Sequence, residues 1–239
     1  MNSGKPKTAI FIIPHAGGSS AYYSRFKLFD SNYFEFIPIE LSGKGKRIGE
    51  ANYRSFQELV SDVYTIISRH IQSNECGAAL WGHSMGGIVA FEIIKLLEHN
   101  YTDRSKLLFV SGCETPEDIS KDLFSKIEDV EKIRTDIIQG EWMPESIINN
   151  KKNFDYFVQI LLKDFSLLAE YKYDKELLNV PIVIMNGNDD TIVEHKERGW
   201  DKYTRGNVYY RIFEGGHFFI DSNLYKIVKC ITEHCKELV

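Results

Sequence analysis

A serine flanked by glycines is the feature of this sequence with the clearest chemical potential. Gly82-His83-Ser84-Met85-Gly86 fits G-x-S-x-G, the nucleophile elbow, in which a serine sits on a sharp turn between a strand and a helix. An apolar run at 78–81 precedes it and suits a buried strand, and an apolar run of helix length at 88–97 follows it. This context favours Ser84 as a nucleophile over the alternative, a serine that only caps a buried helix.

A serine hydroxyl needs a base to activate it, and in hydrolases with this elbow the base is a downstream histidine. Three histidines lie well downstream: His195, His217 and His234. His217 follows a predicted strand at 208–213 and a pair of glycines, at the carboxyl end of a strand, where catalytic groups gather in open α/β sheets. His195 lies in a polar stretch of helical character and His234 in the last helix, and both are expected to face solvent. We therefore expect His217 to be the base.

An acid is needed to hold the imidazole in the right tautomer and to stabilise the imidazolium. Two adjacent aspartates, Asp189 and Asp190, follow a predicted strand at 181–186. The spacing G-x-x-D-x-x-V, which starts at Gly187 and is common in serine hydrolases of this type, selects Asp190. Asp189 stays open as the alternative, and would otherwise be a loop carboxylate that caps the turn.

Two backbone N–H groups are expected to form an oxyanion hole. The amide of Met85, directly after the nucleophile, is one donor by the geometry of the elbow. The second should come from the loop after an early strand, and small residues follow the predicted strand at 8–13. We favour the amide of Ala16. His15 is interpreted as a residue that fixes this loop rather than one that takes part in the chemistry.

The elements that must position these groups alternate between strand and helix. Such an order predicts a mostly parallel sheet with helices on both faces. The length of 239 residues suits one α/β domain spanning 1–239. Ser55-Phe56-Gln57-Glu58 has the pattern of a capping box and predicts a helix that runs to about Gln72. Strands are expected near 8–13, 34–39, 78–81, 107–111, 182–186 and 208–213.

The stretch from about 114 to 179 breaks this alternation and has the character of helices. It falls between the strand that ends at Ser111 and the strand that precedes the acid, where hydrolases of this kind carry a lid. We expect it to gate an acyl pocket, with Pro116, Gly140 and Pro144 as candidate hinges; a packing helix that never moves is the alternative. One helix face gathers Phe154, Phe157, Val158, Leu161, Phe165 and Leu168.

Composition narrows the class of partner and compartment. A net charge of −5, from 29 basic and 34 acidic side chains, argues against nucleic acid, whose phosphates require a basic face. No run approaches the roughly 18 apolar residues of a membrane span, and residues 1–7 lack the apolar core of a signal peptide. The cysteines have no metal-binding spacing, so we expect no metal and reduced thiols in the cytoplasm. They are Cys76, Cys113, Cys230 and Cys235.

Several segments together resemble a known family. They are Pro14-His15-Ala16-Gly17-Gly18, Leu41-Ser42-Gly43-Lys44-Gly45-Lys46-Arg47, Gly82 to Gly87, Leu162-Lys163-Asp164-Phe165, Glu170-Tyr171 and Gly215-Gly216-His217-Phe218. The chain resembles the type II thioesterases, free-standing α/β-hydrolases that serve polyketide synthases and nonribosomal peptide synthetases. Ser42 stands where this family usually has proline, and no position of the expected triad departs from the pattern.

The resemblance implies hydrolysis of acyl thioesters on the phosphopantetheine arm of a carrier protein. It implies a Ser84-His217-Asp190 triad that needs no cofactor, an editing role, and a monomer. Lys44, Lys46 and Arg47 form a basic cluster that could dock the carrier, as could Lys151-Lys152, although solvated surface is the plainer interpretation. Three rivals stay open: a general carboxylesterase or lipase, a catalytically silent binding module, and an acyltransferase with an acceptor other than water.

Overall fold

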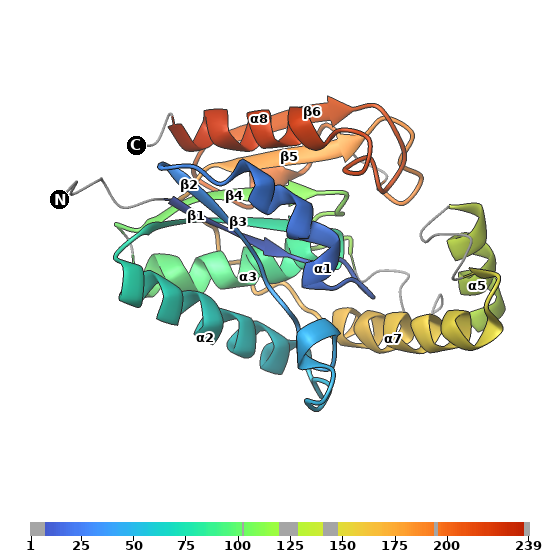
Figure 1. Cartoon of the computed structure of the whole chain (residues 1–239). Helices are drawn as coiled ribbons and strands as arrows, with labels where there is room; N and C mark the ends of the chain where they lie inside the picture. The colour runs from blue at the N-terminus through green and yellow to red at the C-terminus, as the bar shows by residue number, and fades with distance from the viewer. Residues whose placement is uncertain (1–7, 102, 120–128, 141–147, 194–195, 237–239) are drawn as a thin grey trace.

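A parallel sheet of strand order β2-β1-β3-β4-β5-β6 forms the centre of the molecule (Figure 1). The computed structural model describes residues 8–101, 103–119, 129–140, 148–193 and 196–236. The predicted α/β class, with helices on both faces of a parallel sheet, is confirmed. The strands are β1 (Thr8–Ile13), β2 (Phe34–Pro38), β3 (Gly77–His83), β4 (Ser105–Ser111), β5 (Ile182–Gly187) and β6 (Val208–Phe213).

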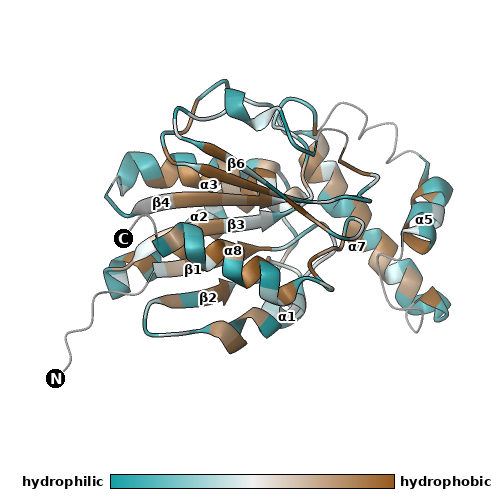
Figure 2. Cartoon of the chain, turned by 90° about the horizontal axis from the view of Figure 1, so that it is seen from above, coloured by the Kyte–Doolittle hydropathy of each residue, from teal (hydrophilic) through white to brown (hydrophobic). Residues whose placement is uncertain are grey.

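Helices cover both faces of this sheet, and each face has its own core. In β1, the side chains of Ala9, Phe11 and Ile13 join the core under the helices at 56–74 and 85–100, whereas Ile10 and Ile12 join the core under the helix at 224–236. A strand buried on both faces is a continuous apolar run, which is why β1 lacks alternation. Figure 2 shows hydrophobic colour along the strands. The helices are α1 (Ser20–Tyr23), α2 (Phe56–Asn74), α3 (Met85–Asn100), α5 (Val130–Gln139), α7 (Lys151–Ala169) and α8 (Leu224–Lys236).

The start of α2 follows the capping prediction only in part. The Ser55 hydroxyl accepts a hydrogen bond from the Glu58 amide at 3.1 Å, as an N-cap should. The Glu58 carboxylate accepts from the Arg54 amide at 2.9 Å, one residue before the partner that a capping box uses. Ser55 therefore caps the helix, and Glu58 binds the amide of Arg54, the residue before the cap.

Residues 114–179, called the insert segment below, separate β4 from β5 and carry α5 and α7. Both helices lie at the end of the sheet toward which β5 and β6 point (Figure 1). The predicted apolar face of α7 packs into the core, with Phe157 and Phe165 partly buried and the others buried. Pro144, a predicted hinge, lies outside the described residues. Among the helices that the structure describes, none is long and apolar enough to span a membrane.

Candidate active site

Ser84 is the single residue between β3 and α3, and its backbone conformation is strained. Its φ of 54° and ψ of −124° lie in a region that residues other than glycine seldom occupy. The flanking glycines are sterically required, because a Cβ on Gly82 would lie 1.9 Å from the Gly86 carbonyl oxygen and one on Gly86 would lie 2.2 Å from that of Ile13. The G-x-S-x-G pattern therefore marks a turn that leaves Ser84 partly exposed at the carboxyl end of β3.

His217 and Asp190 form a buried pair. The Nδ1 atom of His217 lies 2.9 Å from Oδ2 of Asp190, whose side chain has no exposed surface. Asp190 Oδ1 accepts hydrogen bonds from the amides of Ile192 at 2.8 Å and Val193 at 3.4 Å. Burial raises the pKa of Asp190, but the hydrogen bond and charge of His217, with these amides, outweigh it and lower the pKa below its usual value. The ionised carboxylate accepts the Nδ1–H of His217, leaving Nε2 as the basic nitrogen.

The neighbouring aspartate occupies a different environment. Asp189 is exposed, and its backbone amide donates to the Gly215 carbonyl at 3.0 Å. The Asn188 side chain accepts from the Gly215 amide at 2.8 Å. These bonds tie the loop after β5 to the loop after β6 and so help to set the distance between Asp190 and His217. Asp189 contributes to them with its backbone amide.

Ser84 and His217 each lie next to the end of β4. The Ser84 amide donates to the Ser111 carbonyl at 2.8 Å. At the next residue, a Cβ on Gly112 would lie 3.2 Å from Cε1 of His217, the ring carbon between the two nitrogens. Gly112 has a φ of +53°, so the backbone turns away here and makes room for the ring. The structure thus gathers the serine, the imidazole and the carboxylate from the ends of β3, β6 and β5.

The loop after β1 presents its amides beside the elbow. The Gly18 amide donates to the His15 carbonyl at 2.9 Å and closes a turn in which Gly17 has a φ of +77°. The Gly17 amide donates to a carboxylate oxygen of Asp164 at 2.6 Å. Within the part of the chain that the structure describes, the Ala16 amide makes no such bond. The Met85 amide belongs to the first turn of α3 and has no acceptor within that helix.

Two further histidines, His15 and His83, lie near the His217–Asp190 pair, and both are neutral at neutral pH. His15 contacts the hydroxyl of Tyr23 through Nδ1 at 2.7 Å, and burial, with the charges of His217 and Lys44, lowers its pKa to about 3. The ring of His83 lies 5.0 Å from that of His217, centroid to centroid. Burial, with a further effect of His217, lowers the pKa of His83 well below its usual value. Neither ring therefore adds a positive charge beside His217 at neutral pH.

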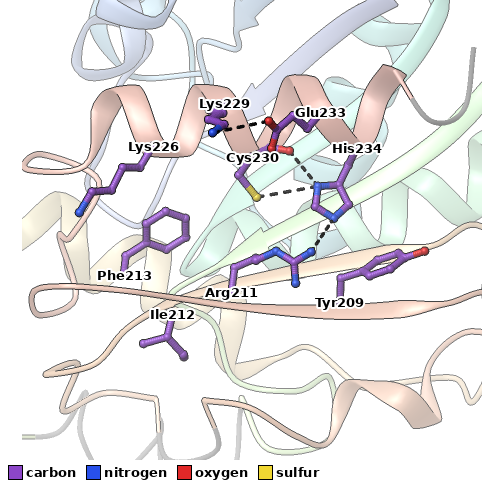
Figure 3. Close-up of a pocket in the computed structure, with 9 residues that line it drawn as sticks. All are labelled: Tyr209, Arg211, Ile212, Phe213, Lys226, Lys229, Cys230, Glu233 and His234. Carbon is purple, nitrogen blue, oxygen red and sulfur yellow. Dashed lines mark hydrogen bonds and ion pairs between the residues drawn. The ribbon is translucent and has the colours of Figure 1, made fainter.

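The other two candidate histidines do not reach this site. His195 lies outside the described residues, and residues 196–199 after it form turns rather than the expected helix. The expectation that His234 faces solvent is wrong: it is buried, because it packs between α8 and β6 with Nδ1 donating to the Cys230 carbonyl at 2.8 Å (Figure 3). Arg211 lies 3.3 Å from its Nε2. The hollow of about 370 Å³ that these residues line contains none of Ser84, Asp190 and His217.

Among the residues that the structure describes, the cysteines and acidic side chains form no cluster with the make-up of a metal centre. All four cysteines are buried thiols. Cys113 packs against α3, where a Cβ on Gly87 would lie 2.9 Å from its Sγ, and burial raises the pKa of its thiol. No group of three potential metal ligands lies together among the residues described.

The basic cluster expected at Lys44, Lys46 and Arg47 is not a docking surface as a whole. Lys44 is buried and its ammonium pairs with Asp164. Arg47 pairs with Glu50 and with Asp62 at 2.7 Å. The expectation of a surface position is wrong for Lys44, because its partner Asp164 lies 120 residues away and the local sequence does not reveal it. Arg47 is partly exposed but already paired, and Lys46 is exposed.

Comparison with known proteins identifies the family. A sequence profile described as a thioesterase domain matches residues 8–235. The chain belongs to the thioesterase family. It is 26% identical over 233 residues to thioesterase PikA5 of Streptomyces venezuelae, covering 96% of this chain and 82% of that protein. It is 25% identical over 236 residues to gramicidin S biosynthesis protein GrsT of Aneurinibacillus migulanus, covering 97% and 89%.

Solved structures share the fold of this chain. ClbQ, from the colibactin NRPS/PKS pathway, superposes with a TM-score of 0.85 at 26% identity over 97% of this chain and 98% of its own. RedJ, a thioesterase from the prodiginine pathway in Streptomyces coelicolor, has a TM-score of 0.83 at 22% identity over 97% and 87%, which supports the fold. The predicted membership and the prediction of a hydrolase acting on thioesters are confirmed.

Sequence reasoning missed the role of Asp164 in this thioesterase. The residue was noted only as part of a family segment, yet it contacts the loop that carries Ala16. A charged residue on the apolar side of a predicted helix, between Leu161 and Leu168, was the available signal, because such a residue is seldom buried without a partner.

Proposed function

We propose that this chain is a type II editing thioesterase that releases acyl groups from the phosphopantetheine arm of carrier proteins. The observation that carries the proposal is a strained Ser84 at the end of β3 together with a buried His217–Asp190 pair, in a member of the thioesterase family. The names of the relatives support the pathway, since GrsT is a gramicidin S biosynthesis protein and ClbQ comes from an NRPS/PKS pathway.

The first half-reaction acylates Ser84. Nε2 of His217 takes the hydroxyl proton as the serine oxygen attacks the thioester carbonyl. The amides of Met85 and Ala16 stabilise the oxyanion, and loss of one such donor typically costs about 100- to 1,000-fold in turnover. Asp190 stabilises the imidazolium without itself becoming protonated. The intermediate collapses and the C–S bond breaks. The imidazolium of His217 gives its proton to the departing thiolate, and the acyl group stays on Ser84 as an ester.

The second half-reaction returns the serine. His217 takes a proton from water as the water attacks the acyl ester, and the same amides hold the second oxyanion. Collapse of this intermediate releases the carboxylic acid and returns the proton to Ser84. A thiol leaves more readily than an alkoxide, so we expect hydrolysis of the acyl enzyme to limit the rate.

The insert segment is proposed as the lid of the acyl pocket within one domain over 1–239. Two α7 side chains support this role, because a Cβ on Gly17 would lie 2.9 Å from the ring of Phe157 and 3.6 Å from Leu161. The helix therefore covers the same loop that supplies the Ala16 amide. A carrier would dock near Lys46 and the exposed Lys151-Lys152 at the start of α7. We keep a cytoplasmic monomer as the expected form.

One comparison tests the proposal. The same acyl group is presented on a phosphopantetheinylated carrier protein, as a small thioester and as an oxygen ester, with Ser84→Ala as the control. A far higher kcat/KM on the carrier, lost in Ser84→Ala, is expected. Equal or better hydrolysis of the oxygen ester would instead indicate a general esterase, and failure of a fluorophosphonate to label Ser84 would indicate a binding module.

A further inference from the structure

Among the described residues, three side-chain anchors hold the loop between β1 and α1, and two of them come from residues 20 or fewer positions away in the sequence. His15 is fixed at the start of the loop by Tyr23, eight residues along the chain. Ser20, at its end, is fixed by Glu40: its amide and hydroxyl both donate to that carboxylate, at 3.0 Å and 2.7 Å. The third anchor, in the middle of the loop, comes from the insert segment.

That middle anchor is the carboxylate of Asp164 on α7. It accepts the Gly17 amide at 2.6 Å, across 147 residues of sequence. The same oxygen pairs with the ammonium of Lys44, from the loop after β2. The side chains of Lys44 and Asp164 are only 6% and 7% exposed, so the carboxylate is fixed between two loops by a buried partner.

The Gly17 bond sets the orientation of the proposed oxyanion donor. A peptide unit is planar, so fixing the Gly17 N–H also fixes the carbonyl of Ala16 and the plane on that side of its Cα. Gly17 has a φ of +77°, and its permissive backbone would otherwise let this plane turn. The direction of the Ala16 N–H is therefore fixed from both sides, by the anchored His15 before it and by the anchored Gly17 amide after it.

We infer that Asp164 is a positioning residue for the oxyanion hole, so that the hole is complete only while α7 is seated. The inference rests on the proposed function, in which the Ala16 amide binds the oxyanion. Its consequence is that the lid helix does more than cover an acyl pocket: seating the helix delivers the carboxylate that aligns the catalytic loop. Movement of α7 would therefore switch kcat as well as substrate access.

Two double variants separate positioning from mere charge pairing. Lys44→Met/Asp164→Asn removes both buried charges but keeps a side-chain carbonyl that accepts the Gly17 amide. Lys44→Met/Asp164→Leu removes both charges and the acceptor. Replacing a buried ion pair by apolar side chains is often neutral for stability, so both proteins are expected to fold. Lys44→Met/Asp164→Ala offers the same comparison with a smaller side chain if the leucine does not fit.

The readout is the split between kcat and KM on a small acyl thioester, with thermal unfolding of each variant. The leucine variant is expected to lose about 100-fold in kcat with little change in KM, the scale of a loss caused by a displacement of about 1 Å. The asparagine variant is expected to retain kcat within about five-fold, because its carbonyl restores the bond to Gly17.

A buried lysine elsewhere gives the matched control. Lys95 on α3 pairs with Glu92 at 2.6 Å and Asp174 at 2.9 Å, away from the catalytic loop. Lys95→Met should lower the melting temperature and leave kcat unchanged.

Two results would overturn the inference, and they can be told apart. If Ser84→Ala keeps the wild-type rate, the proposed function fails and the inference fails with it. If the wild type is active and Ser84→Ala is not, equal kcat values in the asparagine and leucine double variants would reject the role of Asp164 alone.

Discussion

Replacing Asp190 by asparagine tests the proposed triad most directly, because the geometry fixes what the new side chain must do. The amide oxygen of asparagine can still accept from the Ile192 and Val193 amides, which lie 2.8 Å and 3.4 Å from Oδ1 in the native protein. The NH₂ group then faces Nδ1 of His217 and donates to it. The imidazole proton is forced onto Nε2, and this tautomer cannot accept the proton of Ser84.

The expected loss is about 10,000-fold in kcat, as for the equivalent tautomer change in a serine protease. That factor corresponds to about 5 kcal/mol of transition-state stabilisation. The assay is kcat on a small acyl thioester, with the melting temperature measured to show that the protein is folded. Asp189→Asn is the matched control, because this exposed neighbour contacts the His217 loop only through its backbone amide. A folded Asp190→Asn protein with more than a tenth of wild-type kcat, or an equal loss in Asp189→Asn, would refute the reasoning.

Three further predictions follow from packing, charge and pKa. Folded His15 has a pKa of about 3 against 6.5 for the exposed group, so its contribution to the unfolding free energy is present above pH 6.5 and is lost as the pH falls toward 3. The unfolding free energy, measured with denaturant at several pH values in that range, should rise with pH less steeply in His15→Gln, by about 1.4 kcal/mol per pH unit. An unchanged pH dependence would contradict this prediction. Gly86→Ala places a methyl group 2.2 Å from the carbonyl at the end of β1 and should lower the unfolding free energy by about 3 kcal/mol or more. In the control Gly49→Ala, the methyl group meets nothing within 4 Å, and the unfolding free energy from the same denaturant measurement should change by less than about 0.5 kcal/mol. Reversing Lys151 and Lys152 to glutamate should raise KM for a carrier-bound acyl group about three- to ten-fold and spare a small thioester; equal effects on both substrates would reject docking at this site.

Local sequence was enough to predict most of the sheet. The strand expected at 8–13 is β1 and the one at 208–213 is β6, with the same bounds, because each is a short run bounded by turn residues. The strand expected at 78–81 extends to His83, since the elbow begins inside the strand rather than after it. Helix α2 starts at the predicted cap and continues two residues past Gln72.

The errors fell on polar side chains that tertiary packing buries. His234 was expected in solvent as part of the last helix, yet α8 turns it against β6, where the Cys230 carbonyl accepts from it and Arg211 lies next to it. Lys44 was expected on a basic surface, and Asp164 withdraws it from solvent. Burial of a charge requires a partner, and a single sequence does not say which distant carboxylate will supply one.

The sequence by itself determined the elbow, the order of strands and helices, and the family, because glycine at close backbone approaches and apolar periodicity are local physical requirements. Tertiary structure alone decided which groups meet. It brought Asp190 within 2.9 Å of His217 and left Asp189 exposed, and it placed Asp164 of α7 against Gly17. Those contacts depend on how the ends of parallel strands converge and on where the insert segment packs, which are properties of the whole chain.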